Sequence, residues 1–184
     1  MKLADEIKYK LMAQIGHSPS DLLIPNFYMS TFYEMDLFKI TRAGLITEFE
    51  IKISRSDYKN DFKKGASNFG DSKHDELKKG LRFCNYFYFV VPENLISINE
   101  VPEYCGLIYY NKFQRFDYIK KAKKLHKTQF TDYKFLCEKL TGRCNALQGK
   151  IMMNNYDRER SEKARAKLIE LLRKNNIEIP FDTW

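Results

Sequence analysis

The chain has 184 residues, a length that suits one domain with a small appendage. Hydrophobic residues make up 43% and charged residues 30%, which excludes a disordered chain and supplies a core without disulfides. Because 32 Lys and Arg outnumber 24 Asp and Glu, the net charge is +8 and favours polyanionic partners. No window approaches the roughly 20 consecutive apolar residues that span a bilayer, so no membrane partner is expected.

The first residues and the cysteines predict a cytoplasmic protein. Charged residues begin at Lys2, and the apolar region of a signal peptide is missing. The four cysteines form no Cys-x-x-Cys pair, so we expect free thiols in a reducing compartment rather than a zinc site.

Apolar spacing predicts the elements in chain order. Leu3, Ile7, Leu11 and Ile15 recur at helical spacing, which predicts a helix over 3–15. The aromatic and β-branched runs that follow predict strands, and the next polar stretches predict helices. The remaining predictions are strands at 26–33, 35–41 and 47–53, a helix from Ser54 to 63 or 64, a mobile loop at 65–72, a helix at 73–79, a buried strand at 86–91, strands at 106–110 and 115–119, and helices at 131–148 and 157–174.

This order predicts an α/β fold with a mixed central sheet flanked by helices. We expect an α/β core over 1–128 and a basic helical C-terminal extension over 129–184, packed on the core. The tail 177–184 is rich in apolar residues, and it would dock either on its own domain or on a second copy, so a homodimer stays open.

The most informative stretch is Glu50-Ile51-Lys52, with Asp36 before it. A strand places Glu50 and Lys52 on one face, with Cβ atoms about 7 Å apart. In a hairpin, a two-residue turn sets Asp36 opposite Ile51, on the wrong face. A three-residue loop over 43–45 sets Asp36 opposite Lys52, and Gly44 suits the left-handed position that such loops need.

Side chains that meet in this way have a familiar chemistry. Two carboxylates and a backbone carbonyl bind a hard cation such as Mg²⁺, which activates water and stabilises charge on a phosphate. A nearby lysine orients the water or neutralises the transition state. Acid-x-Lys triplets are common, however, and the alternative is a solvated strand face with an ordinary salt bridge.

The arrangement of Asp36 before Glu50-Ile51-Lys52 resembles the PD-(D/E)XK nuclease superfamily, and the order helix, three strands, helix, strand fits the core of that superfamily. More narrowly, three blocks within 30–120 resemble the MmcB-related DNA repair proteins: Glu50-Ile51-Lys52-Ile53-Ser54-Arg55-Ser56-Asp57-Tyr58, Lys73-His74-Asp75-Glu76-Leu77, and Tyr86–Glu93 continuing to Pro102–Ile108. The resemblance implies a restriction-endonuclease-like core.

The resemblance also implies a metal-dependent DNA phosphodiesterase that uses Mg²⁺ or Mn²⁺, in DNA repair or mobile-element DNA processing. Asp36, Glu50 and Lys52 would be catalytic, and Asp36, Glu50 and the Ile51 carbonyl would bind the metal. The alternative is a catalytically inactive nuclease-fold protein that binds nucleic acid or a protein partner.

Two residues near Asp36 bear on this assignment. Met35 stands where the superfamily often has proline, which weakens the motif. Glu34 shares the parity of Asp36 and would replace it in another register.

Three further side chains are candidates for supporting roles. Glu6 matches the place where many such nucleases add an acid on the first helix. Asp57, with Asp61 on the same helical face, would reach the metal through water, or would be an exposed charge in the first helical turn. His74 would contact phosphate, or would simply cap or pack.

The basic segment after the last strand predicts DNA binding. Residues 112–150 hold 11 Lys or Arg and 3 Asp or Glu, a balance of +8 that equals the net charge of the chain. Such a segment attracts phosphates without reading sequence, although a solvated helix face would look the same. The candidate DNA contacts are Arg55, Lys120, Lys121, Lys123, Lys124 and Lys127.

Overall fold

The computed structural model describes residues 2–16, 21–30, 33–63 and 72–174. It divides into two units, Met1–Thr131 and Asp132–Trp184. The loop expected at 65–72, apart from Ser72, and the tail at 177–184 lie outside the described residues.

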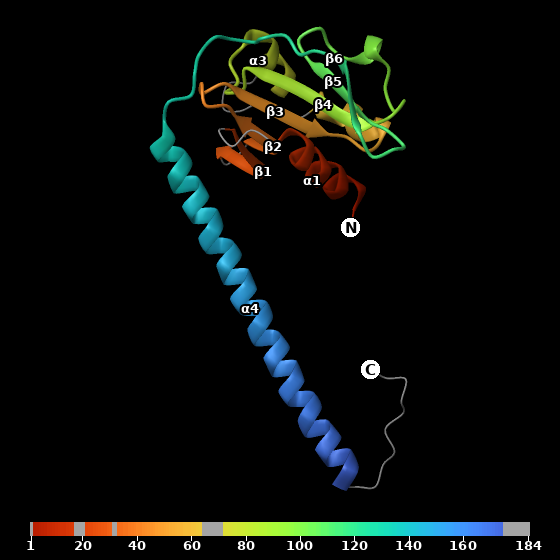
Figure 1. The fold of residues 1–184 in the computed structure, drawn as a ribbon, viewed down its shortest axis with the longest axis vertical. Helices are drawn as coiled ribbons and strands as arrows, with labels where there is room; N and C mark the ends of the chain where they lie inside the picture. Colours follow the sequence, from red (N-terminus) through yellow and green to blue (C-terminus); the bar gives the residue numbers. More distant parts are fainter. Residues whose placement is uncertain (1, 17–20, 31–32, 64–71, 175–184) are drawn as a thin grey trace. The chain divides into compact units, whose positions relative to one another are not determined.

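The first unit contains a six-stranded mixed sheet whose strands lie in chain order (Figure 1). Strands β3, β4 and β5 are parallel, whereas β1, β2 and β3 pair antiparallel, as do β5 and β6. The expected mixed α/β architecture is therefore confirmed. The strands are β1 Leu22–Ser30, β2 Tyr33–Ile40, β3 Ile46–Ile51, β4 Tyr86–Pro92, β5 Gly106–Tyr110 and β6 Phe116–Lys120.

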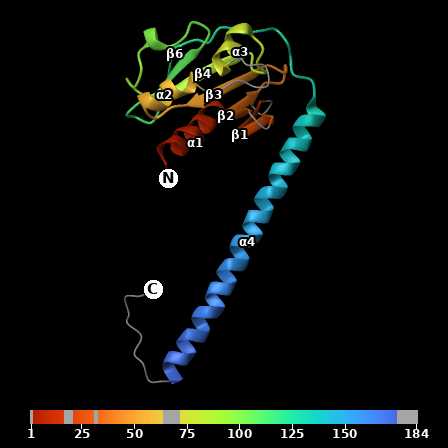
Figure 2. The same cartoon turned by 180° about the vertical axis from the view of Figure 1, so that it is seen from behind.

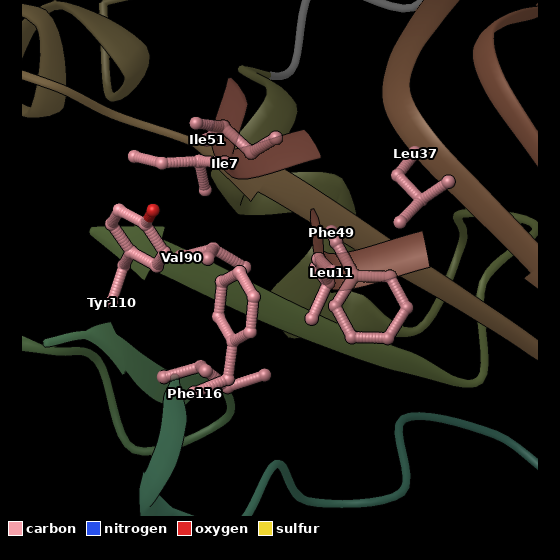
Figure 3. Close-up of a cluster of buried hydrophobic side chains, with 9 residues drawn as sticks. Ile7, Leu11, Leu37, Phe49, Ile51, Val90, Tyr110 and Phe116 are labelled. Carbon is pink, nitrogen blue, oxygen red and sulfur yellow. The ribbon is translucent and has the colours of Figure 1, made fainter. Parts of the chain in front are cut away.

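Helix α1, Leu3–Ile15, covers one face of this sheet. Its Ile7 and Leu11 are fully buried and belong to one apolar cluster with Phe49, Ile51 and Val90 (Figure 3). This is the alternation expected of β3, because Phe49 and Ile51, two residues apart, both enter the apolar layer.

The opposite face of β3 carries Glu48 and Glu50, and Lys52 follows on the same side. Two helices pack on this face, α2, Arg55–Asp61, and α3, Lys73–Lys79 (Figure 1 and Figure 2). Both helices are short and capped. Ser54 accepts the Asp57 N–H at 3.1 Å and so begins α2. Ser72 accepts the Asp75 N–H and begins α3, which ends at Gly80 in the left-handed conformation.

A single helix, α4, Tyr133–Lys174, accounts for the described part of the second unit. The two separate helices predicted there were wrong, because 149–156 contains no proline and continues in good helix formers such as Lys150 and Met152. Ion pairs one turn apart support it, with 3.0 Å between Arg158 and Glu162. Within the described residues, α4 and the other helices are too short or too polar to cross a membrane.

Candidate active site

The β2–β3 hairpin sets the register of the candidate acids. Its loop has three residues, 42–44, because Thr41 pairs with Leu45 through an N–H···O bond of 3.0 Å. The Thr41 hydroxyl also accepts the Leu45 N–H, and Gly44 takes the left-handed φ of +72°. The predicted loop 43–45 was therefore wrong by one residue.

This register keeps Asp36 on the predicted face but gives it another neighbour. The last backbone pair is Leu37 with Phe49, so Asp36 lies level with Glu50 rather than Lys52. A shift of two residues preserves parity in a strand, and both acids therefore share a face. Glu34, the predicted substitute, is exposed and pairs with Tyr28 of β1.

The Asp36 carboxylate acts as the hydrogen-bond acceptor at the point where the backbone pairing of β2 with β3 ends. Its Oδ2 accepts the Ile51 N–H at 2.8 Å. Because the N–H and C=O of a strand residue point to the same neighbouring strand, the Ile51 carbonyl faces β2 as well. Asp36 thus lies beside Glu50 and Ile51 at the end of β3.

Glu50 and Lys52 form a buried ion pair beside this point. The Lys52 ammonium lies 2.7 Å from Glu50 Oε1 and 3.1 Å from Asp61 Oδ1. The side chains of Glu50 and Lys52 are only 4% and 3% exposed. The helix α2 therefore closes this face by bringing Asp61 to the lysine.

A second ammonium, from Lys73 on α3, enters the same place. Its Nζ lies 2.9 Å from Glu50 Oε2, 3.2 Å from Asp61 Oδ2 and 3.5 Å from Glu48 Oε1. Both oxygens of Glu50 therefore contact an ammonium. We refer to Glu48, Glu50, Lys52, Asp61 and Lys73 as the ionic cluster.

The electrostatics of the cluster differ between its lysines and Asp36. Burial opposes the charged forms of Lys52 and Lys73, but the carboxylates around them outweigh it and hold both pKa values above the ordinary range. Burial and the nearby Glu50 raise the pKa of Asp36 from 3.8 to about 6. The lysines are thus cationic at neutral pH, whereas Asp36 lacks enough compensating positive charge.

These donors suit a hard divalent cation in type and in charge. Asp36 and the cluster supply four carboxylates against two ammonium groups, which leaves a formal charge of −2 when all are ionised. Oxygen donors of this kind are the ligands that Mg²⁺ and Mn²⁺ prefer. Among the described residues, no three His, Cys, Asp or Glu side chains are grouped to hold a metal ion.

The three supporting candidates lie in different places. Asp57 reaches the rim of the cluster, 3.7 Å from the Lys52 ammonium. His74 lies deeper, bonded to Asp61 at 2.9 Å and to the Tyr104 hydroxyl at 3.0 Å. Glu6 lies on α1, across the sheet, where hydrogen bonds from Lys10 and Tyr110 lower the pKa of its carboxyl.

Several predicted DNA contacts have partners inside the protein. Arg55 binds the Leu95 carbonyl and Glu100, and Lys123 pairs with Glu103. The Lys120 ammonium donates to the carbonyls of Val101 and Pro102 at 2.9 and 2.8 Å. The exposed cations of the predicted set are Arg55, Lys121, Lys123, Lys124 and Lys127.

Lys73 is the principal site residue for which the sequence analysis gave no role. It stands at the first position of α3, directly after the Ser72 cap. A cation there opposes the helix dipole, which favours acids in the first turn. That local mismatch is a sequence signal from which a partner elsewhere in the fold could have been expected.

The fold and the site define a mixed α/β protein with an acid and lysine cluster at the end of its third strand. No family model matches the sequence. No curated protein matches it either. The fold is similar to that of the SPO1766 protein of unknown function from Silicibacter pomeroyi, with a TM-score of 0.52 and 17% identity over 80% of this chain and 87% of that chain. At that identity the similarity establishes a shared fold alone.

Proposed function

We propose that this chain is a metal-dependent DNA phosphodiesterase of the PD-(D/E)XK type, working with Mg²⁺ or Mn²⁺. The observation that carries the proposal is the meeting of Asp36, Glu50 and Lys52 at the end of β3, where the Asp36 carboxylate binds the Ile51 N–H. The proposal further assigns the first unit to the restriction-endonuclease-like class, with DNA repair or mobile-element processing as its setting.

Each residue of the site has a role in this proposal. Asp36, Glu50 and the Ile51 carbonyl would hold the cation, which supplies a bound water of lowered pKa and charge stabilisation at the phosphate. Lys52, kept protonated by Glu50 and Asp61, is an electrostatic group and no base at neutral pH. It would stabilise the negative charge that grows on the phosphate oxygens.

The test is cleavage of DNA by the full chain with a matched pair of variants. Linear, branched and single-stranded DNA are incubated with Mg²⁺ or Mn²⁺ and the wild type, Glu50→Gln or Glu93→Gln. Glu93 is also a glutamate at the end of a central strand, but it is exposed and lies after β4. We expect Glu50→Gln to lose at least about a hundredfold in rate, as for removal of a group that stabilises the transition state, and Glu93→Gln to retain activity.

The same assay can defeat the proposal. Cleavage that Glu50→Gln performs as fast as the wild type would come from a contaminant. No cleavage of any DNA by the wild type, with either metal, would leave the second candidate.

That second candidate is a nuclease-fold protein that binds nucleic acid without cleaving it. The burial of Glu50 and Lys52 favours it, because a phosphate has to reach side chains that are 4% and 3% exposed. Calorimetry with Mn²⁺ separates the two candidates. Binding that Asp36→Asn abolishes supports the phosphodiesterase, whereas DNA binding in the absence of any Mn²⁺ binding supports the second candidate.

A further inference from the structure

The Lys73 ammonium contacts Glu50, one of the two acids proposed to bind the metal. It contacts the oxygen of Glu50 that Lys52 does not contact, and it bridges to Glu48 and Asp61. Its side chain is 5% exposed, and its Nζ also lies 4.8 Å from the centre of the Phe87 ring. A monovalent cation that belongs to the chain itself therefore offsets part of the negative charge of these carboxylates.

We propose that Lys73 is a positioning residue that holds Glu50 in the resting protein and competes with the divalent cation for it. This inference rests on the proposed function, since it concerns the same carboxylates. It goes further in naming what a metal has to displace and in predicting that the site binds metals weakly until Lys73 withdraws.

The attachment of Lys73 allows that exchange. Glu50 lies on β3 and Lys73 on α3, so the ammonium can leave while the strand keeps its pairing with β4. Lysine carries its charge on a flexible four-carbon stem. Asp61 and Glu48 also contact Lys73, and they offer it a partner after Glu50 has been released.

A purely structural ion pair makes a different prediction. If Lys73 only stabilised the fold, its removal would destabilise the protein and leave the metal affinity of the folded form unchanged. Competition requires the affinity to rise when the ammonium is removed, because two cations cannot share one carboxylate oxygen without repulsion.

The experiment is calorimetric titration of the full-length protein with MnCl₂, without DNA. The variants are Lys73→Met, which removes the charge, Lys73→Arg, which keeps it, and Lys78→Met, an exposed control on the same helix. We expect Lys73→Met to bind Mn²⁺ at least about tenfold more tightly than the wild type. Lys73→Arg and Lys78→Met should bind like the wild type, and adding Glu50→Gln to Lys73→Met should remove the gain.

The outcomes distinguish this inference from the proposed function. Equal Mn²⁺ affinity in the wild type and Lys73→Met overturns the role of Lys73 alone, and so does a gain that survives Glu50→Gln. No Mn²⁺ binding in any variant overturns both proposals. If Lys73→Met does not fold, circular dichroism during refolding decides, because Mn²⁺ should restore the folded signal and an unchanged unfolded signal contradicts competition.

Discussion

At the scale of single residues, Asp36 sets how the site responds to pH. Its carboxyl is partly buried, receives one backbone N–H and lies near Glu50, which together leave its pKa at about 6. A group with a raised pKa in the folded state binds a proton that the unfolded chain has already lost. The unfolding free energy therefore falls as pH rises from about 4 to about 6, and it stays lower above that range.

Replacing Asp36 by Asn should remove that loss, because the amide is neutral at every pH and its oxygen can still accept the Ile51 N–H. In the absence of divalent metal, we expect the variant to be more stable than the wild type by up to about 3 kcal/mol at pH 7 to 8. The advantage should vanish near pH 4. Urea unfolding across this range measures it, and a stability difference that does not change with pH would contradict the assignment.

Part of the candidate site could be predicted from the sequence alone. The alternation of Glu48, Glu50 and Lys52 against Phe49 and Ile51 fixed the faces of β3, since side chains in a strand alternate strictly. The three-residue loop favoured by Gly44 put Asp36 on the correct face, but opposite Lys52, whereas the structure sets it level with Glu50. Lys73 received no role, because its place in the first turn of α3 indicates a partner without saying which one. The contact with Glu50 depends on how α3 lies on the sheet after more than twenty residues of intervening chain.

At the scale of elements, the segment between β6 and α4 is held to the core although it has no regular structure. Leu125 N–H binds the Asn85 carbonyl at 2.9 Å, and Phe130 N–H binds the Gly44 carbonyl at 2.8 Å. A Cβ on Gly44 would lie 2.6 Å from the Phe130 carbonyl oxygen. The hairpin glycine therefore serves two purposes, a left-handed turn and a close approach of backbone.

The Asn85 side chain joins the segment between β6 and α4 to β3 through hydrogen bonds. It is fully buried, its Oδ1 accepts the Ile46 N–H at 2.7 Å, and its Nδ2 donates to the carbonyls of His126 and Thr128 at 3.1 and 2.8 Å. Asn85→Ala should lower the unfolding free energy by about 2 to 4 kcal/mol, because it leaves buried backbone groups without a partner.

The matched control is Asn60→Ala, at an exposed position of α2, for which a change within about 0.5 kcal/mol is expected. Urea denaturation measures both. Equal stability of Asn85→Ala and Asn60→Ala would show that the segment does not depend on this amide.

The success of the sequence predictions varied by element for physical reasons. Helix α1 was predicted with its observed ends, because its apolar period is clean. Strand β1 begins at Leu22, earlier than the predicted Asn26, because Pro25 is tolerated in an edge strand. The attachment of the segment between β6 and α4 to the core was not predicted, because its lysines suggest a solvated linker and its bonds to Gly44 and Asn85 depend on the tertiary fold.

At the scale of the whole molecule, the excess charge lies in one stretch of the chain. Residues 112–150 carry a balance of +8, equal to the total, so the rest of the sequence is neutral. Lys120 is committed to backbone carbonyls and Lys123 to Glu103. Lys121, Lys124 and Lys127 are exposed and remain the better candidates for phosphate contacts.

Neutralising these three lysines together should weaken DNA binding and make it less sensitive to salt. If each contacts a phosphate, the slope of log affinity against log salt should fall by about 2 to 3 for duplex DNA. Fluorescence anisotropy over a series of NaCl concentrations measures the slope. The control removes the same charge elsewhere, with glutamine at the exposed Lys2, Lys59 and Lys78. An equal fall in both triple variants would indicate a general effect of net charge.

The length of α4 has a consequence for how far such binding would extend. Its 42 residues make a rod about 60 Å long, at 1.5 Å per residue. Duplex DNA rises 3.4 Å per base pair, so the rod equals about 18 base pairs. A polyanion lying along it would be shielded over nearly two helical turns whatever its base sequence. A stretch of DNA of that length protected from cleavage would thus reflect the length of α4 rather than recognition of bases.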